Sequence, residues 1–195
     1  MGDLRFHDRL GIAVAVLAFV CAGTARAENG ALGGIIDEAK IGIEAHDITF
    51  GGRHKENGAD INEEILFVSP GFLSVIGAPR PHLGGQINTA GNTDQAYAGL
   101  TWGAALFDRI LGQSDALSIY GSLGGAYQDG YQNEPQVPGR KDLGAAILFR
   151  ESAELGYQIC PVASISMVVD HISNANLAPH NAGITNAGAR IGFKF

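Results

Sequence analysis

A histidine and a serine stand two residues apart near the end of the chain, in the stretch VVDHISNANL at residues 168–177. A serine hydroxyl alone is a weak nucleophile, and a histidine within hydrogen-bond reach activates it by taking its proton. On one face of a β-strand, the backbones of His171 and Ser173 would lie about 7 Å apart, which an imidazole and a hydroxyl can span. The spacing therefore permits a nucleophilic esterase site, although a polar strand end without a catalytic role has the same pattern.

The residues that precede the pair alternate in character, as expected for a strand with two different faces. One face carries His171 and Ser173 together with Ala163, Ile165, Met167 and Val169, and the other carries Ser164, Ser166, Val168 and Asp170. What the apolar face touches therefore decides the surroundings of the two reactive groups.

The rest of the chain also favours strands over helices. Glycine provides 28 of the 195 residues, turn signals recur at short intervals, and no long segment has an apolar period of 3.6 residues. We expect eight strands, at residues 38–50, 60–69, 81–89, 95–106, 116–127, 143–158, 162–174 and 183–195.

The two faces of these strands differ in polarity. One face is apolar, whereas the other is rich in glycine and carries the charged residues Glu44, Arg150, Glu154, Arg190 and Lys194. An apolar exterior around a polar interior is typical of transmembrane β-barrels, and closure of the barrel pairs every backbone group within lipid. We therefore expect an all-β fold, an eight-stranded antiparallel transmembrane β-barrel. An alternating last strand that ends on Phe195 resembles those of bacterial outer-membrane barrels.

The N-terminal residues predict export. An uncharged apolar run at residues 10–23 precedes Ala25-Arg26-Ala27, which fits the A-x-A cleavage rule of signal peptides. The run is shorter than the about 20 apolar residues of a membrane-spanning helix. We expect residues 1–27 to be a signal peptide and residues 28–195 to be one outer-membrane barrel domain. Of the 13 basic and 20 acidic residues, 10 and 18 lie after residue 27, and a net charge of −8 argues against a nucleic-acid partner.

The lengths of the connections orient this barrel. Periplasmic turns are short and extracellular loops are longer in such proteins. The link at residues 160–161 is tight, and the longest loop is expected at residues 128–141. With both termini in the periplasm, His171 and Ser173 lie at the extracellular end and face lipid. Polar groups on a lipid-facing surface are functional candidates, and the substrate available there is the lipid of the outer leaflet.

The sequence HISNA at residues 171–175, with Asn181, Gly183 and the terminal RIGFKF, resembles the lipid A 3-O-deacylase (PagL-type) family. The stretch LFRESAELGYQ at residues 148–158 is also similar to that family, whereas earlier strands match only in general character. The resemblance implies an eight-stranded outer-membrane barrel that removes the 3-O-linked acyl chain of lipid A. It also implies Ser173 as the nucleophile, His171 as the general base and Asn174 as a contributor to the oxyanion hole.

The third member of the site is where the chain departs from this family. Well-known members carry a glutamate early in the last strand, and Thr185 occupies that position here. A threonine can bond to the imidazole but cannot stabilise its cation by charge, and triads without the acid keep reduced activity. A turn centred near residue 160 would bring Glu151 beside His171. Two interpretations of Glu151 follow: it is the acid that orients His171, or it is an ordinary residue of the barrel rim.

Three hypotheses for function follow from these observations. The first is an esterase that acts on lipid A, the second is a small non-catalytic barrel or inactive homologue, and the third is another lipid A enzyme such as an acyltransferase. The HISNA sequence favours the first. No G-x-S-x-G, H-E-x-x-H or phosphate loop occurs in the sequence, so we expect no cofactor and no metal. The expected partners are lipopolysaccharide and membrane lipids, with a homodimer as an open alternative to a monomer.

Overall fold

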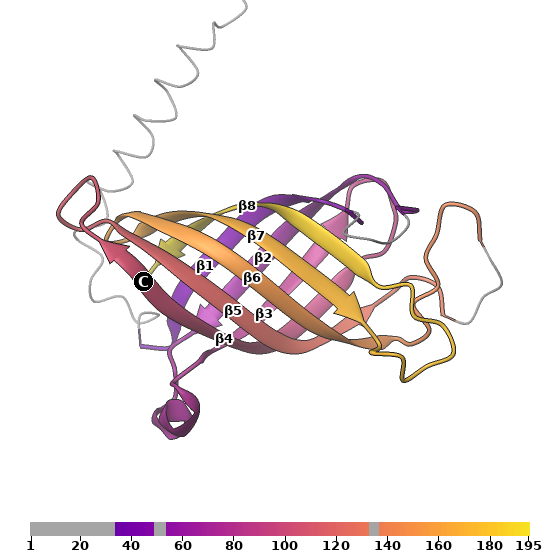
Figure 1. Ribbon diagram of the computed structural model, residues 1–195, viewed down its shortest axis with the longest axis horizontal. Helices are drawn as coiled ribbons and strands as arrows, with labels where there is room; N and C mark the ends of the chain where they lie inside the picture. The colour runs from indigo at the N-terminus through magenta and orange to yellow at the C-terminus, as the bar shows by residue number, and fades with distance from the viewer. Residues whose placement is uncertain (1–33, 49–53, 133–136) are drawn as a thin grey trace, which may run out of the picture.

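The computed structural model describes residues 34–48, 54–132 and 137–195. Eight antiparallel strands form one closed barrel in which each strand pairs with its neighbour in sequence and β8 pairs with β1 (Figure 1). The strands are β1 (Ile36–Ala45), β2 (Ala59–Phe67), β3 (Arg80–Asn88), β4 (Gln95–Asp108), β5 (Ala116–Gln128), β6 (Ile147–Cys160), β7 (Ala163–Ser173) and β8 (Ile184–Lys194). The predicted fold class is confirmed. The expected signal peptide at residues 1–27 lies outside the described residues.

Two predicted strand ends were wrong by more than two residues. The first strand was expected to continue to residue 50, but β1 ends at Ala45, and the chain turns at Asp47 with a positive φ of 53°. The sixth strand was expected to begin at residue 143, but β6 begins at Ile147. Leu143 is completely buried and Gly144 has a φ of 73°, so this segment folds across the barrel instead of extending its wall.

Charged and polar side chains fill the lumen, as the alternation predicted. Glu44, Arg150, Glu154 and Arg190 are each at most 5% exposed. Lys40 Nζ lies 2.8 Å from one carboxylate oxygen of Glu154, and the other oxygen of Glu154 accepts a hydrogen bond from Arg190. The guanidinium of Arg150 lies 3.7 Å from the centre of the Tyr97 ring. These pairings are required because an unpaired charge in a closed interior costs several kcal/mol.

The outer face is apolar around the barrel. Large exposed side chains on it include Ile41, Ile43, Ile61, Ile65, Leu83, Ile87, Ile119, Leu123, Leu155, Ile165, Met167, Ile191 and Phe193. This polarity is the reverse of that in a water-soluble barrel and fits a barrel wall in contact with lipid. None of the helices among the described residues has the length and apolar character needed to cross a membrane.

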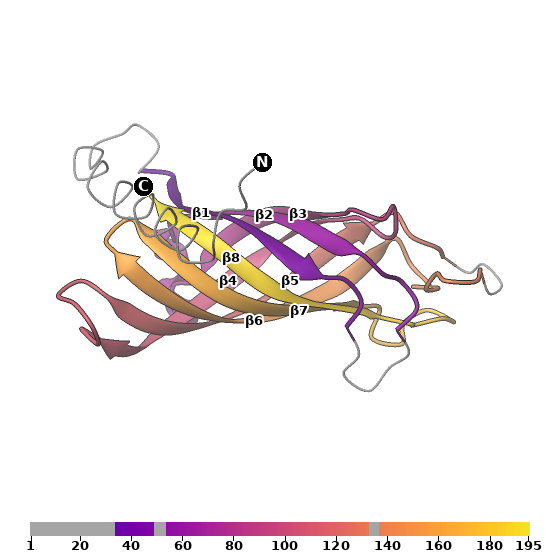
Figure 2. The same cartoon turned by 90° about the horizontal axis from the view of Figure 1, so that it is seen from above.

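The two ends of the barrel differ. The start of β1 and the end of β8 lie at one end, and the loops before β2, β4, β6 and β8 lie at the other (Figures 1 and 2). At the loop end, Leu143 packs with Ile172 and Ile184 in an apolar cluster that closes the mouth above the polar lumen. Ile172 and Ile184 are the inward neighbours of His171 and Thr185, so this cluster lies directly behind the candidate site.

Candidate active site

His171 lies on the outer face of β7, directly across from Thr185 of β8. The imidazole Nδ1 is 2.7 Å from the hydroxyl oxygen of Thr185, and both residues are half-buried. When Nδ1 carries the hydrogen, the ring donates to the threonine oxygen and Nε2 is left unprotonated. A histidine in this state can accept a proton from a nearby hydroxyl.

Ser173 is the last residue of β7 and projects from the same face as His171. Across from it on β6 lies Phe149, whose side chain is 53% exposed on the apolar surface. In the part of the chain that the structure describes, the Ser173 hydroxyl makes no hydrogen bond. A polar group that could react is thus left uncommitted at the edge of the lipid-facing wall.

Glu151 is the β6 residue that pairs with His171, on the side away from Thr185. Its side chain is exposed and forms no hydrogen bond or ion pair with any described residue. The histidine therefore has a neutral hydroxyl as its bonded partner and a carboxylate on the neighbouring strand. Asp170 is turned into the lumen, where it accepts a hydrogen bond of 2.8 Å from Gln86.

Asn174 follows Ser173 and holds the loop between β7 and β8. Its Nδ2 donates to the backbone oxygens of Leu143, at 2.9 Å, and His180. Its backbone N–H donates to Oδ1 of Asn181 at 3.0 Å. Because these donors are engaged, a contribution of Asn174 to an oxyanion hole requires one of the bonds to be exchanged when substrate binds.

Below the site, away from the loops, the outer face is lined by small side chains. The residues in register across five strands are Gly121, Ala153, Val169, Ala187 and Ala45. A depression of about 330 Å³ lies over the middle of this row, at Ala153, Val169 and Ala187, and larger apolar residues, among them Ile119, Leu155 and Met167, also line it. A second depression of about 660 Å³ shares Leu155 and Met167 with it and continues towards Ile165 and Ile191. The apolar lining suits a hydrocarbon chain.

Sequence reasoning did not identify a role for Gly183 or Lys141 at this site. Gly183 has a φ of 43°, and a Cβ built on it would lie 2.9 Å from Cε1 of His171. Lys141 comes from the loop before β6, and its Nζ donates to the carbonyl oxygen of Gly183 at 2.7 Å. The glycine was visible as the first residue of the expected last strand, but the lysine, 42 positions away, gave no signal.

Among the described residues, no group of three or more His, Cys, Asp or Glu side chains is arranged to hold a metal ion.

Comparisons with known proteins bear on this site. The family model for lipid A 3-O-deacylase (PagL) matches residues 73–194. The crystal structure of the outer membrane enzyme PagL is similar to the chain with a TM-score of 0.59 and 14% identity, covering 81% of this chain and 99% of that one. The outer membrane protein Ail of Yersinia pestis, solved in a phospholipid bilayer nanodisc, has a TM-score of 0.40 and 13% identity, with 82% and 99% covered. No curated protein matches the chain.

The family match carries more information than the structural likeness, which at 14% identity shows the fold alone. It spans more than half of the chain, from before β3 to the end of β8, and includes every candidate site residue. The barrel is that of a bacterial outer-membrane protein, and the sequence match assigns the family. The chain therefore belongs to the lipid A 3-O-deacylase (PagL) family.

Proposed function

We propose that this protein is an outer-membrane esterase that removes the 3-O-linked acyl chain of lipid A, with Ser173 as the nucleophile and His171 as the general base. The observation that carries the proposal is the contact of 2.7 Å between His171 and Thr185 beside an uncommitted serine hydroxyl. Family membership supports the substrate class. The apolar depressions next to the pair support a substrate with hydrocarbon chains.

The proposed reaction has two steps. The oxygen of Ser173 attacks the ester carbonyl while Nε2 of His171 takes the hydroxyl proton. The tetrahedral intermediate then expels the sugar oxygen, which receives that proton, and an acyl-serine remains. Water next attacks the acyl-serine, with His171 again accepting a proton and returning it to the serine. The products are a free fatty acid and the deacylated lipid A.

Thr185 has the orienting role in this proposal, because its hydroxyl is bonded to Nδ1. A neutral hydroxyl fixes the ring and its tautomer but leaves the imidazolium without a bonded anion. Glu151 on the adjacent strand supplies a negative charge at longer range. Asn174 is retained as an oxyanion contributor through exchange of one of its Nδ2 bonds. All of these residues belong to one chain, so the proposal does not require a homodimer.

The test is mass spectrometry of lipid A from cells that express the protein and from matched cells that do not. Loss of one 3-O-linked acyl chain supports the esterase, gain of a chain indicates an acyltransferase, and no change favours a non-catalytic barrel. Ser173→Ala and His171→Ala should each abolish the loss. Heat-modifiable gel migration serves as the control, because both side chains lie outside the lumen and the barrel should still assemble. Full activity in either variant would show that the nucleophile and base are elsewhere.

A further inference from the structure

The start of β8, which carries Thr185, is held by loops from distant parts of the sequence. The segment Lys141–Leu143 lies across it with two hydrogen bonds, from Lys141 Nζ to Gly183 O at 2.7 Å and from the Ala182 N–H to Asp142 O at 3.1 Å. The Leu143 oxygen also accepts the bond from Asn174, on the other arm of the same loop. One short segment thus bridges both sides of the candidate site.

The loop before β2 binds the same region. The Ile48 N–H donates to the carbonyl oxygen of Thr185 at 2.7 Å, and the Asp47 N–H donates to Oδ1 of Asn186 at 3.0 Å. The Asp47 carboxylate pairs with the buried ammonium of Lys141. The backbone around Thr185 is therefore fixed by Lys141 and by the partner of Lys141.

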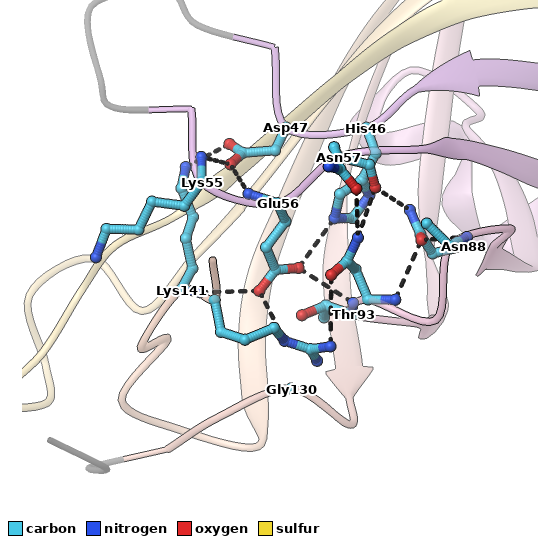
Figure 3. Close-up of polar contacts among 12 residues, drawn as sticks. His46, Asp47, Lys55, Glu56, Asn57, Asn88, Thr93, Gly130 and Lys141 are labelled. Atoms are coloured by element: carbon cyan, nitrogen blue, oxygen red, sulfur yellow. Dashed lines mark hydrogen bonds and ion pairs between the residues drawn. The ribbon is translucent and has the colours of Figure 1, made fainter. Parts of the chain in front are cut away.

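Figure 3 shows that Lys141 and Asp47 belong to a larger cluster of polar and charged side chains that includes His46 and Glu56. The Lys141 N–H donates to Glu56 at 2.9 Å, and the same carboxyl group lies 3.1 Å from Nε2 of His46. His46 Nδ1 lies 2.8 Å from Asp60. Burial lowers the pKa of His46, but hydrogen bonds to Asp60 and Glu56 outweigh it and raise the pKa to about 9. Lys141 is thus anchored in a paired, charged cluster and does not swing freely.

Gly183 connects this cluster to the imidazole. Its backbone lies so close to His171 that a Cβ there would be 2.9 Å from Cε1 and 3.2 Å from Nε2. A shift of Gly183 therefore changes the space available to the ring. The carbonyl group of the same residue is the one that Lys141 holds.

We propose that Lys141 is a positioning residue for His171, which it acts on by holding Gly183 and Asp47 so that the start of β8 stays against the imidazole. The role deepens the proposed esterase function and rests on it. Lys141 itself is buried behind the strand and does not touch the reacting atoms. Removal of its ammonium should release Gly183 and loosen the ring on one side, while the outer face that binds lipid stays intact.

The experiment compares Lys141→Met and Lys141→Arg with Lys55→Met, which removes an exposed lysine from a neighbouring loop. We expect Lys141→Met to lower kcat by about tenfold to a hundredfold, the range for a misplaced catalytic group, with little change in KM. Lys141→Arg should recover most of the rate because it restores a cationic donor. Lys55→Met should behave as the wild type. In Lys141→Met the Asp47 carboxylate loses its cation, which could itself lower the rate. The double variant Lys141→Met/Asp47→Asn removes that charge and should remain slow if loss of the Gly183 contact is the cause.

A second readout is independent of catalysis. The Cε1–H resonance of His171, assigned with His171→Gln, should shift in Lys141→Met and not in Lys55→Met. An unchanged resonance together with an unchanged kcat would overturn the positioning role. If the wild type does not deacylate lipid A at all, the esterase proposal fails, and the resonance still decides whether Lys141 positions the ring.

A second and independent observation concerns the connection between β2 and β3. It contains a short 3-10 helix, η2 (Gly71–Ile76), with no buried residue. Phe72 is 74% exposed, Val75 87% and Ile76 49%, and the first and last turns carry no charged side chain. Apolar side chains gathered in this way are rarely left in water.

The position of η2 indicates what covers it. The Trp102 indole N–H donates to the carbonyl oxygen of Ile76 at 2.8 Å, which ties the last residue of η2 to β4. In Figure 1, η2 projects sideways from the wall, at the end where β8 finishes. Tryptophan is enriched where a membrane meets water. The apolar side chains of η2 therefore continue the lipid-facing surface at the level of the interface.

We infer that η2 inserts Phe72 and Val75 into the interfacial region of the periplasmic leaflet and anchors this side of the barrel. Trp102 is the one tryptophan of the sequence, so Phe72→Trp adds a single second reporter. In proteoliposomes, brominated phospholipids should quench more of the emission of Phe72→Trp than of the wild type, most strongly with bromine near the headgroup. Heat-modifiable migration checks folding. If Phe72→Trp adds no quenching, residue 72 lies in water or against a second copy of the chain, and the inference is overturned.

Discussion

Replacement of Thr185 is the sharpest test of how the histidine is held. In Thr185→Val the shape of the side chain is kept, but the hydroxyl that lies 2.7 Å from Nδ1 is lost. A hydrogen bond of this kind contributes about 1 kcal/mol, which corresponds to about fivefold in rate when the bond is needed to orient the base. We therefore expect Thr185→Val to keep a folded barrel and to deacylate about five times more slowly.

Thr185→Glu changes the rate in the opposite direction. The carboxylate would occupy the position where the resemblance to the family predicts an acid, with its charge next to the imidazolium that forms during attack. An oriented acid contributes up to about 10⁴ in rate in soluble triads. The site is half-buried, so solvent weakens the charge interaction, and we expect an increase of about tenfold to a hundredfold. Thr185→Gln is the matched control, because it has the size of glutamate without the charge.

The assay is release of the 3-O-linked fatty acid from purified lipid A in mixed micelles, with kcat and KM measured separately. Thr185→Val at the wild-type rate would mean that the hydroxyl does not orient His171. Thr185→Glu no faster than Thr185→Gln would mean that the imidazolium gains nothing from an acid at this position.

Three further outcomes are expected. Glu151→Gln should lower kcat by about fivefold, because a solvated carboxylate near His171 stabilises the imidazolium by about 1 kcal/mol. An unchanged kcat would show that Glu151 has no part in the reaction. Ala187→Leu should fill the row of small side chains below His171 and Ser173. It should lower kcat/KM for long acyl chains by about tenfold, as loss of contact with about two methylenes predicts. An equal change in kcat/KM for short and long chains would count against an acyl site there. Since folding raises the pKa of His46 from 6.5 to about 9, its contribution to the free energy of unfolding should be complete below pH 6.5 and lost as the pH rises through about 9. Unfolding in detergent across that range, compared with His46→Gln, measures it.

The barrel could be predicted from the sequence because a lipid-facing strand requires its two faces to differ at every second residue. That alternation also assigned Arg150, Glu154 and Arg190 to the lumen, where the structure has them. The short turn near residue 160 also brought Glu151 beside His171, although it predicted residue 149 opposite His171. An irregularity between Gln158 and Cys160 shifts the register so that Glu151 is the direct partner. Local periodicity and short connections are sufficient for such inferences because they involve neighbouring strands only.

The loops could not be predicted in the same way. Leu143 was expected to begin the sixth strand, whereas it packs across the mouth against Ile172 and Ile184. Lys141 looked like one charged residue of a polar loop, and its two partners, Asp47 and Gly183, lie far away in the sequence. No periodicity connects such positions, because side chains from separate loops come together only when the barrel has closed.

The sequence by itself thus determined the strand faces, the lumen charges and the placement of His171 and Ser173 two positions apart on one face. The tertiary structure alone decided that Thr185, and not Glu151, bonds to Nδ1 of His171. Both residues flank the histidine on adjacent strands, and alternation puts both on the outer face. Which of them reaches the ring depends on the orientation of the imidazole, and only the folded structure shows that orientation and the closeness of Gly183 to the ring.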